Sequence, residues 1–167
     1  MQLSSQPIPP GFRTVTVSMT VSNAAEAIEF YKKALGAEEI MRMAGPDGRI
    51  GHAELKIGDS IVFLNDEMPG GVGCPKSPQT LGGTSGSVYL YVEDVDKSFE
   101  QAVHAGGKSN MPVMDMFWGD RFGGFVDPFG HSWGLATHTR DLSPEEIEEG
   151  ARAFWAQMAE MAQKKSA

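Results

Sequence analysis

The sequence predicts an α+β fold in which two βαβββ modules form a cupped mixed sheet, followed by a C-terminal helix. Two similar segments carry this prediction, residues 21–36 (VSNAAEAIEFYKKALG) and residues 92–107 (VEDVDKSFEQAVHAGG). Each reads as a strand end, an Asx helix cap, an amphipathic helix and a terminal glycine. Their offset of 71 residues is too long for a solenoid repeat, so it indicates a duplicated supersecondary unit.

The domain organisation follows from this duplication. Residues 1–142 are expected to form one domain, with modules at about 10–65 and 87–142. A linker at 66–86, rich in glycine and proline, joins them. A loop of this length is uncommon unless it is a spacer or a lid, and the sequence leaves both roles open. Residues 143–167 are expected to form a separate amphipathic helix.

Each element of the first module has a local signal. Residues 14–21 alternate polar and apolar side chains, as a half-buried strand does. Asn23 is placed to cap a helix that Gly36 ends. Turns rich in glycine then separate three further expected strands, near 38–43, 49–57 and 60–65.

The second module repeats this order. We expect a strand at 87–92, a helix at 94–105, and strands near 112–118, 121–126 and 131–137. Turn residues at 119–120 and 127–130 separate the last three strands.

The tail carries its own helix signals. Ser143 is an expected N-cap, Pro144 occupies the first helical position, and Glu146 completes a capping box. One apolar stripe follows, made of Ile147, Ala151, Phe154, Trp155, Met158 and Met161. We expect this stripe to be buried against a partner subunit or the back of the sheet.

Composition bounds the partners and the compartment. The chain has 167 residues, 41% of them apolar, which suits one soluble globular domain. The net charge of -8 argues against nucleic acid and against an anionic membrane surface. No apolar stretch approaches a membrane span, and the first residues lack the pattern of a signal peptide. The single cysteine, Cys74, excludes an internal disulfide and favours the cytoplasm.

Three segments carry a family resemblance. They are FYKKALGAEE, GRIGHAELKIGDSIVFLND, and YVEDVD followed by FWGDRFGGFVDPFGHSWGLATH. Over about residues 10–142 the chain resembles the vicinal oxygen chelate (VOC) superfamily, which includes glyoxalase I, bleomycin resistance proteins and extradiol dioxygenases. It looks most like the PhnB-like branch. The resemblance implies the glyoxalase/bleomycin-resistance fold and a homodimer in which both modules complete the cups.

The resemblance also bears on metal binding. The metal enzymes of this superfamily hold a divalent ion with one His or Glu from each of four strands. Carried over, those positions fall near Thr16, at Val62 or Phe63, at Ser87 and at Gly134. None of these residues is a metal ligand, so we predict no metal residues and no cofactor. A divalent metal bound elsewhere is the less favoured alternative.

Strand alternation predicts which side chains enter the cup. The predicted polar face contains Thr16, Ser18, Thr20, His52, Glu54, Lys56, Ser87, Tyr89, Tyr91, Ser132, Gly134, Ala136 and His138. Trp118, at a hairpin tip, could stack on a flat ligand. We therefore expect ligand contacts from Ser18, His52, Glu54, Tyr89, Tyr91, Trp118 and His138. The alternative is that this face is plain solvated sheet surface.

His52 and Glu54 are the candidates for catalysis. They lie two residues apart on one expected strand, so both point to the same side. They could act as an acid–base pair, form a relocated metal site with His138, or only make hydrogen bonds across the sheet. Asp120 and Arg121 are expected to fix a turn and to pair with each other.

The predicted function is that of a glyoxalase/bleomycin-resistance-like protein. It would bind a small organic molecule in a cup between the two modules, without the four-ligand metal site. The sequence favours binding without turnover but leaves three alternatives. These are a metal-dependent lyase or dioxygenase with relocated ligands, a metal-free isomerase using His52 and Glu54, and a non-catalytic domain that docks through its C-terminal helix. It does not name the ligand or say whether the modules pair within or between chains.

Overall fold

The fold is α+β and duplicated, as predicted. The computed structural model describes residues 6–68, 70 and 74–165. The first module contains β1 (Val17–Val21), α1 (Ala24–Leu35), β2 (Glu38–Ala44), β3 (Ile50–Ile57) and β4 (Ser60–Asp66). The second contains β5 (Ser87–Tyr91), α3 (Val95–His104), β6 (Lys108–Asp115), β7 (Asp120–Val126) and β8 (Ser132–His138). A short helix α2 (Pro78–Leu81) lies between the modules, and α4 (Pro144–Lys165) follows the second.

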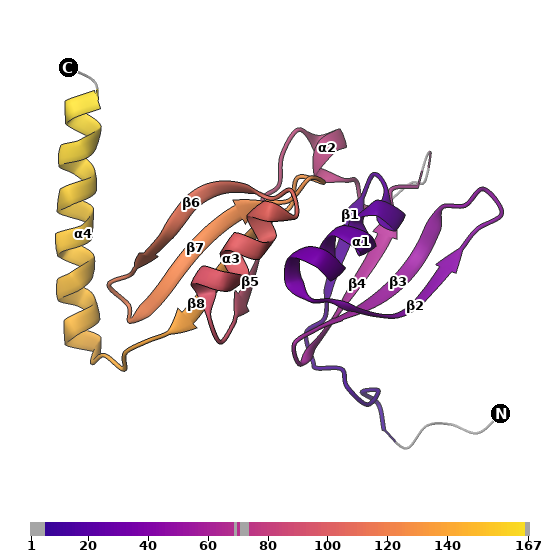
Figure 1. Cartoon of the computed structure of the whole chain (residues 1–167), viewed down its shortest axis with the longest axis horizontal. Helices are drawn as coiled ribbons and strands as arrows, with labels where there is room; N and C mark the ends of the chain where they lie inside the picture. Colours follow the sequence, from indigo (N-terminus) through magenta and orange to yellow (C-terminus); the bar gives the residue numbers. More distant parts are fainter. Residues whose placement is uncertain (1–5, 69, 71–73, 166–167) are drawn as a thin grey trace.

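Each module forms its own mixed sheet. The strand orders are β1-β4-β3-β2 and β5-β8-β7-β6. In both sheets the first strand pairs in parallel with the last, and the other pairings are antiparallel. The two sheets lie side by side, with α1 and α3 meeting between them (Figure 1). Gln101 on α3 donates a hydrogen bond to the carbonyl oxygen of Lys33 on α1, at 2.7 Å.

The largest differences from the predicted strand boundaries are in β1 and β6, and β6 begins at Lys108 rather than near residue 112. β1 begins at Val17 rather than residue 14 because Val17 already pairs with Val62, near the start of β4. β6 ends at Asp115 because Met116 and Gly119 hydrogen-bond within the β6–β7 turn. Phe117 and Trp118 therefore belong to that turn rather than to a strand.

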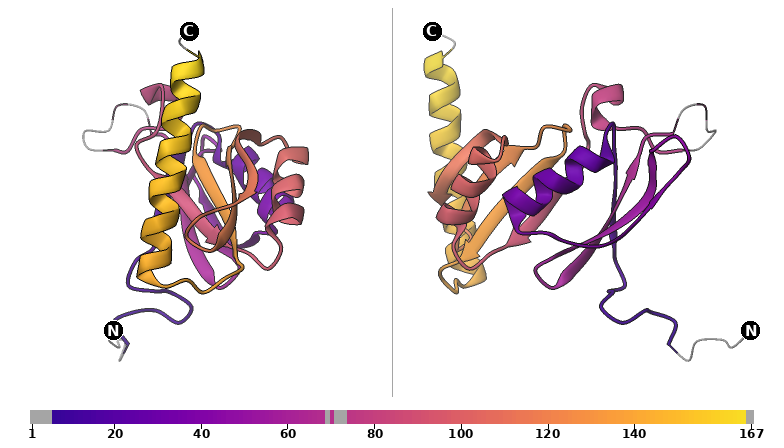
Figure 2. Two further views of the ribbon diagram at one scale, coloured as in Figure 1. Left: turned by 90° about the vertical axis from the view of Figure 1, so that its left-hand side faces the viewer. Right: turned by 45° about the vertical axis from the view of Figure 1, so that its right-hand side comes forward.

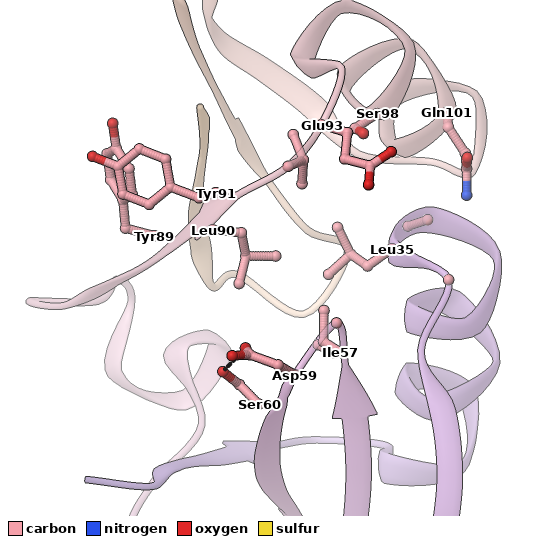
Figure 3. A pocket seen from close by; sticks show the side chains of 14 residues that line it. Leu35, Ile57, Asp59, Ser60, Tyr89, Leu90, Tyr91, Glu93, Ser98 and Gln101 are labelled. Atoms are coloured by element: carbon pink, nitrogen blue, oxygen red, sulfur yellow. Dashed lines mark hydrogen bonds between the residues drawn. The ribbon is translucent and has the colours of Figure 1, made fainter. Parts of the chain in front are cut away.

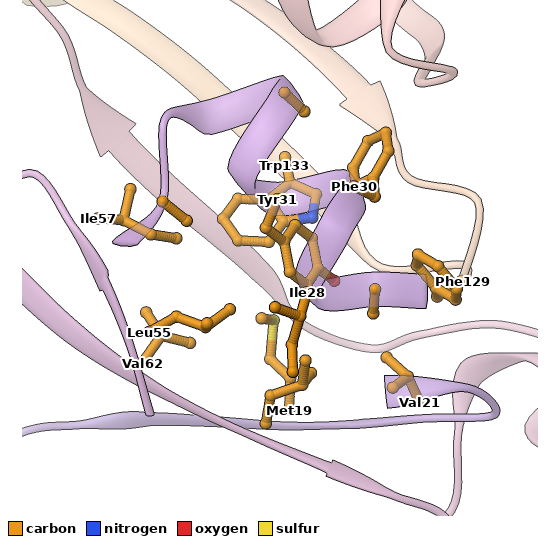
Figure 4. Packing of buried hydrophobic residues seen from close by; sticks show 14 of the residues in the cluster. Met19, Val21, Ile28, Phe30, Tyr31, Leu55, Ile57, Val62, Phe129 and Trp133 are labelled. Carbon is orange, nitrogen blue, oxygen red and sulfur yellow. The ribbon is translucent and has the colours of Figure 1, made fainter. Parts of the chain in front are cut away.

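One hydrophobic core joins the modules. Tyr31 on α1 is fully buried and packs against Trp133 of β8, with ring centroids 5.3 Å apart. Figure 4 shows this contact beside Ile28 and Phe129. The Tyr31 hydroxyl donates to Asp127 at 2.7 Å, and the Trp133 indole donates to the same carboxylate at 2.9 Å. Burial, together with Asp127, raises the pKa of Tyr31 well above its ordinary value.

The described part of the linker forms a clasp. Glu67 accepts hydrogen bonds from the backbone and hydroxyl of Ser77, at 2.9 and 2.7 Å, and from the hydroxyl of Thr80 at 2.6 Å. Gln79 donates to the carbonyl oxygen of Pro128 in the second module. These contacts tie α2 to both modules, which favours the spacer role over a lid. Residues 69 and 71–73 of the predicted linker lie outside the described residues.

The helix α4 stands at the outer end of the second module, away from the first (Figures 1 and 2). Its capping box is present, since Ser143 and Glu146 exchange backbone-to-side-chain hydrogen bonds at 2.7 and 3.2 Å. Phe154 packs on Phe117, with ring centroids 5.5 Å apart. Ile147 and Ala151 of the predicted stripe are half-buried, whereas Trp155, Met158 and Met161 are exposed, Trp155 at 65%. None of the helices within the described ranges is long and apolar enough to cross a membrane.

Candidate functional site

Strand alternation sorts the side chains as predicted. Leu55, Leu64 and Leu135 are buried on the face of each sheet that α1 or α3 covers. We call the opposite side of each sheet its open face. The predicted ligand contacts divide between the two open faces. Ser18, His52 and Glu54 belong to the first sheet, and Tyr89, Tyr91, Trp118 and His138 to the second.

The open face of the first sheet carries the His52–Glu54 pair. His52 Nε2 lies 3.3 Å from Glu54 Oε1, and the His52 ring meets Phe63 edge-on at 4.8 Å. A cavity of about 560 Å³ opens beside Glu54 and Phe63, where the N-terminal segment, including Phe12, passes over the sheet. The face thus offers one carboxylate, one imidazole and an aromatic wall.

On the second open face, Asp120 contacts all four of the predicted ligand-binding residues. These contacts were not predicted from the sequence. The side chain of Asp120 is only 3% exposed. Its Oδ2 accepts from the Tyr91 hydroxyl at 3.0 Å, the Trp118 indole at 3.1 Å and the Tyr89 hydroxyl at 3.3 Å. Its Oδ1 lies 2.8 Å from Nδ1 of His138. Nε2 of His138 in turn lies 3.0 Å from Asp141, on the segment that leads to α4.

The predicted pairing of Asp120 with Arg121 is wrong. Consecutive residues of a strand point to opposite faces, and both residues belong to β7. Arg121 instead makes two 2.7 Å hydrogen bonds to Asp96 and one of 3.2 Å to Asp115. Asp120 also closes the β6–β7 turn as predicted, since its carbonyl oxygen accepts from the Met116 N–H at 2.7 Å, and its side chain is the central group of the candidate site. The sequence places Asp120 at the start of one strand and His138 at the end of the next, but only the register between β7 and β8 sets them opposite each other.

These contacts shift the pKa values of Asp120, His138, Tyr89 and Tyr91. Burial opposes ionisation of Asp120, but hydrogen bonds from His138, Tyr91, Trp118 and Tyr89 outweigh this, so its pKa is lowered. The pKa of His138 is raised by hydrogen bonds to Asp141 and Asp120. Burial and the Asp120 charge raise the pKa of Tyr89 to about 12, and the hydrogen bond to Asp120 raises that of Tyr91. At neutral pH the carboxylate is charged and both phenols keep their protons.

Stacked rings form the floor beside this cluster. Tyr89 and Phe122 stack nearly parallel, with centroids 5.3 Å apart and planes at 14°. They lie over Gly134, because a Cβ built there would fall 2.7 Å from Phe122 and 3.2 Å from Tyr89. Trp118 meets Phe122 edge-on at 6.1 Å. Sequence reasoning missed Phe122, whose only signal was that β7 also alternates.

The residues present do not fit the four-ligand metal site implied by the resemblance. Gly134 supplies no ligand atom and is covered by the two rings, and Thr16 and Ser87 are not typical divalent-metal ligands at such a site. The relocated set of His52, Glu54 and His138 is split between two sheets. Across the described ranges, no group of three or more His, Cys, Asp or Glu side chains is arranged to hold a metal ion.

A further cavity lies elsewhere, between the modules. It has a volume of about 750 Å³, and Leu35, Ile57 and Leu90 are among its lining residues. Figure 3 shows the rings of Tyr89 and Tyr91 pointing away from Leu90 and the centre of this cavity. One of its polar side chains, Gln101, makes the hydrogen bond between α3 and α1. The clustered polar and aromatic groups favour the open face of the second sheet as the candidate site.

Comparisons with known proteins agree with the fold. A family model described as "Glyoxalase/Bleomycin resistance protein/Dioxygenase superfamily" matches residues 13–135. An uncharacterized protein of Mycobacterium bovis is 43% identical over 131 residues, covering 78% of this chain and 86% of the relative. The crystal structure of TioX from Micromonospora sp. ML1 matches with a TM-score of 0.61 and 27% identity, covering 75% of this chain and 98% of TioX. A PhnB protein from Bacillus cereus shares the fold, with a TM-score of 0.56 and 18% identity over 75% of this chain and 99% of that protein.

Proposed function

Because the chain belongs to the glyoxalase/bleomycin resistance protein/dioxygenase superfamily, we propose that it binds a small organic molecule with a flat ring, without turnover. The binding site is the open face of the second sheet. The ligand lies against Trp118 and the Tyr89–Phe122 stack, and Tyr91 and His138 provide polar contacts. Ser18, His52 and Glu54 contact the ligand from a first-module face.

One observation carries this proposal. The stacked rings of Tyr89 and Phe122 occupy the space over Gly134, and Trp118 stands edge-on beside them. Tyr89 and Tyr91 are 43% and 66% exposed although their chemistry favours burial or contact. We call the aromatic side chains Tyr89, Tyr91, Trp118 and Phe122 the shelf. An exposed aromatic surface beside a buried carboxylate is better explained by recognition of a flat molecule than by a sheet surface that only contacts solvent.

The test is a fragment screen observed by NMR through the indole N–H signals. Flat heteroaromatic fragments should shift the signal of Trp118 and leave that of Trp133, which is 1% exposed, unchanged. Trp118→Phe assigns the signal and should weaken binding while circular dichroism shows an intact fold. If no fragment moves the Trp118 signal, the proposal is wrong. Chemical change of a bound fragment over hours would replace binding by catalysis.

Catalysis remains the alternative because His52 Nε2 and Glu54 Oε1 lie within 3.3 Å. A metal-free isomerase would use this pair, and its activity would disappear in His52→Gln. A lyase or dioxygenase would need a metal. Elemental analysis after incubation with nickel, zinc, manganese and ferrous iron tests this, because our proposal includes no cofactor. Near-stoichiometric metal that is lost in His52→Ala or Glu54→Ala would overturn it.

The proposed assembly is a homodimer. Tyr89 and Tyr91 on the second open face and the apolar residues Trp155, Met158 and Met161 of α4 are exposed in the described chain, and the N-terminal segment covers only part of the first open face. A second copy could cover them and bring a first-module face toward a second-module face. Light scattering of the full chain and of a chain lacking residues 143–167 tests this. A monomeric full chain refutes the dimer, and an unchanged dimer after truncation removes α4 from the interface.

A cytoplasmic location stays a prediction that rests on the lone, exposed Cys74.

A further inference from the structure

The direction of the hydrogen bonds around Asp120 determines what the second open face can offer a ligand. An ionised carboxylate only accepts hydrogen bonds, so the hydroxyls of Tyr89 and Tyr91 and the indole of Trp118 must donate to it. Each of these groups has a single hydrogen to donate. Three donors of the shelf are therefore already used by the protein itself.

What remains available is a set of acceptors. Each tyrosine oxygen keeps lone pairs after donating its proton, whereas the indole nitrogen of Trp118 has none to offer. A phenol that donates to a carboxylate has a more negative oxygen, because hydrogen bonds in a chain polarise one another. Tyr91 is 66% exposed, so its oxygen can be reached from solvent.

The charge of the cluster points the same way. The contacting ionisable groups besides the phenols are Asp120, His138 and Asp141. With His138 protonated the three carry a net charge of -1, and with His138 neutral a net charge of -2. Since Asp120 is 3% exposed, water screens its charge poorly. Exposed aromatic faces beside this negative charge add cation–π attraction.

We infer that the shelf selects flat ligands that carry a cationic nitrogen with at least one N–H, such as an aryl-methylammonium group. Asp120 is the positioning residue for this selectivity, because it holds the phenols as acceptors without touching the ligand. Neutral ligands of the same shape lack the electrostatic and cation–π attraction to the cluster, and anionic ligands are repelled by its negative charge. The inference rests on the proposed function and adds the chemical class of the ligand.

Three probes with the same ring test the inference, namely (1-naphthylmethyl)ammonium, 1-naphthylmethanol and 1-naphthylacetate. Isothermal titration calorimetry with the full chain should give the tightest binding for the ammonium. The preference over the alcohol should be about tenfold, within the range of a desolvated cation–π contact. Binding of the acetate should be the weakest.

Variants identify the source of the preference. Asp120→Asn should abolish the preference, so that the ammonium and the alcohol bind this variant with affinities within about twofold of each other. If this variant does not fold, Tyr91→Phe keeps the ring, removes one acceptor and should weaken ammonium binding by about threefold or more. Equal or tighter binding of the alcohol or acetate overturns the inference and leaves the proposed function standing. No binding of any probe overturns both.

Discussion

Replacing Gly134 by alanine should disrupt the shelf while leaving the fold intact. The added methyl carbon would lie 2.7 Å from Phe122 and 3.2 Å from Tyr89. Carbon atoms in contact prefer about 3.5–4.0 Å, so the Phe122 ring has to move by about 1 Å. The stack can open outward because Tyr89 is 43% exposed.

The magnitude follows from two opposed effects. Overpacking of this kind costs about 1–3 kcal/mol, and replacing a strand glycine by alanine returns roughly 0.5–1 kcal/mol. Taking the middle of both ranges, the free energy of unfolding should fall by about 1 kcal/mol, which for a chain of this size lowers Tm by about 2–4 °C. Because the stack is lost, affinity for (1-naphthylmethyl)ammonium should fall about tenfold.

Gly123 provides a matched control on the opposite face of the same sheet. A Cβ there would meet Val113 at 2.8 Å and Phe99 at 3.0 Å, beneath α3. Gly123→Ala should lower Tm by a similar amount and change probe affinity less than about twofold. Thermal denaturation, near-ultraviolet circular dichroism and calorimetry check both variants. If Gly134→Ala keeps wild-type Tm, aromatic dichroism and affinity, the rings do not lie over Gly134 and the reasoning is wrong.

Three further predictions concern the core, the cluster and the clasp. Tyr31→Phe removes the buried 2.7 Å hydrogen bond from Tyr31 to the Asp127 side chain and should cost about 1–3 kcal/mol in urea unfolding. A loss below about 0.5 kcal/mol would contradict the stabilising role of this contact between the modules. The raised pKa of His138 means that its stabilising contribution is complete below about pH 6.5 and is lost as pH rises through the folded-state value, so an NMR titration should find the pKa raised and His138→Gln should remove this part of the pH dependence. Glu67 has a pKa of about 2, lowered by Thr80 and Ser77, so its contribution is complete above about pH 4.5 and is lost as pH falls toward 2; an unchanged acid limb of the stability curve in Glu67→Gln would refute this assignment.

The sequence correctly predicted the features that depend only on residues close together in the chain. The caps at Asn23 and Ser143 are one example, because the capping oxygen and the amide that it accepts lie within three residues of each other. The buried face of each strand is another, since period-two alternation needs no knowledge of the neighbouring strand.

The sequence could not predict contacts that depend on register between strands. Asp120 meets His138 because β7 and β8 pair in one particular register. From the sequence alone the oppositely charged neighbour Arg121 looked like the better partner. The sequence shows that Gly134 has no side chain. It does not show that the rings of Phe122 and Tyr89, on the two neighbouring strands, cover this position. A one-residue slip in pairing would have sent Phe122 to the other face.

The internal duplication allows the two faces of the fold to be compared within one molecule. The first strands pair with the last in the same register in both sheets, so Ser18–Phe63 corresponds to Tyr89–Gly134. In the antiparallel pairs, Ala53–Leu64 corresponds to Gly123–Leu135. His52 of the first copy is therefore equivalent to Phe122 of the second. Positions under the helices keep apolar or small residues in both copies: Met19 and Leu90, Ala53 and Gly123, Leu64 and Leu135. Positions on the open faces changed in kind: Ser18 to Tyr89, His52 to Phe122, Phe63 to Gly134.

This contrast has a physical reason. Core positions are constrained by close packing, where a change of one methylene group is felt, so both copies had to keep them. Open-face positions have no such constraint within the chain, yet the second copy holds an ordered, mutually dependent set. Tyr89 and Phe122 require a small residue at Gly134, and Tyr91 and Trp118 require the acceptor at Asp120. A plain solvated surface does not need substitutions that depend on one another. The dependence among these residues therefore favours selection for a bound molecule on this face, and it predicts that single substitutions within the set act non-additively in double-mutant cycles of probe binding.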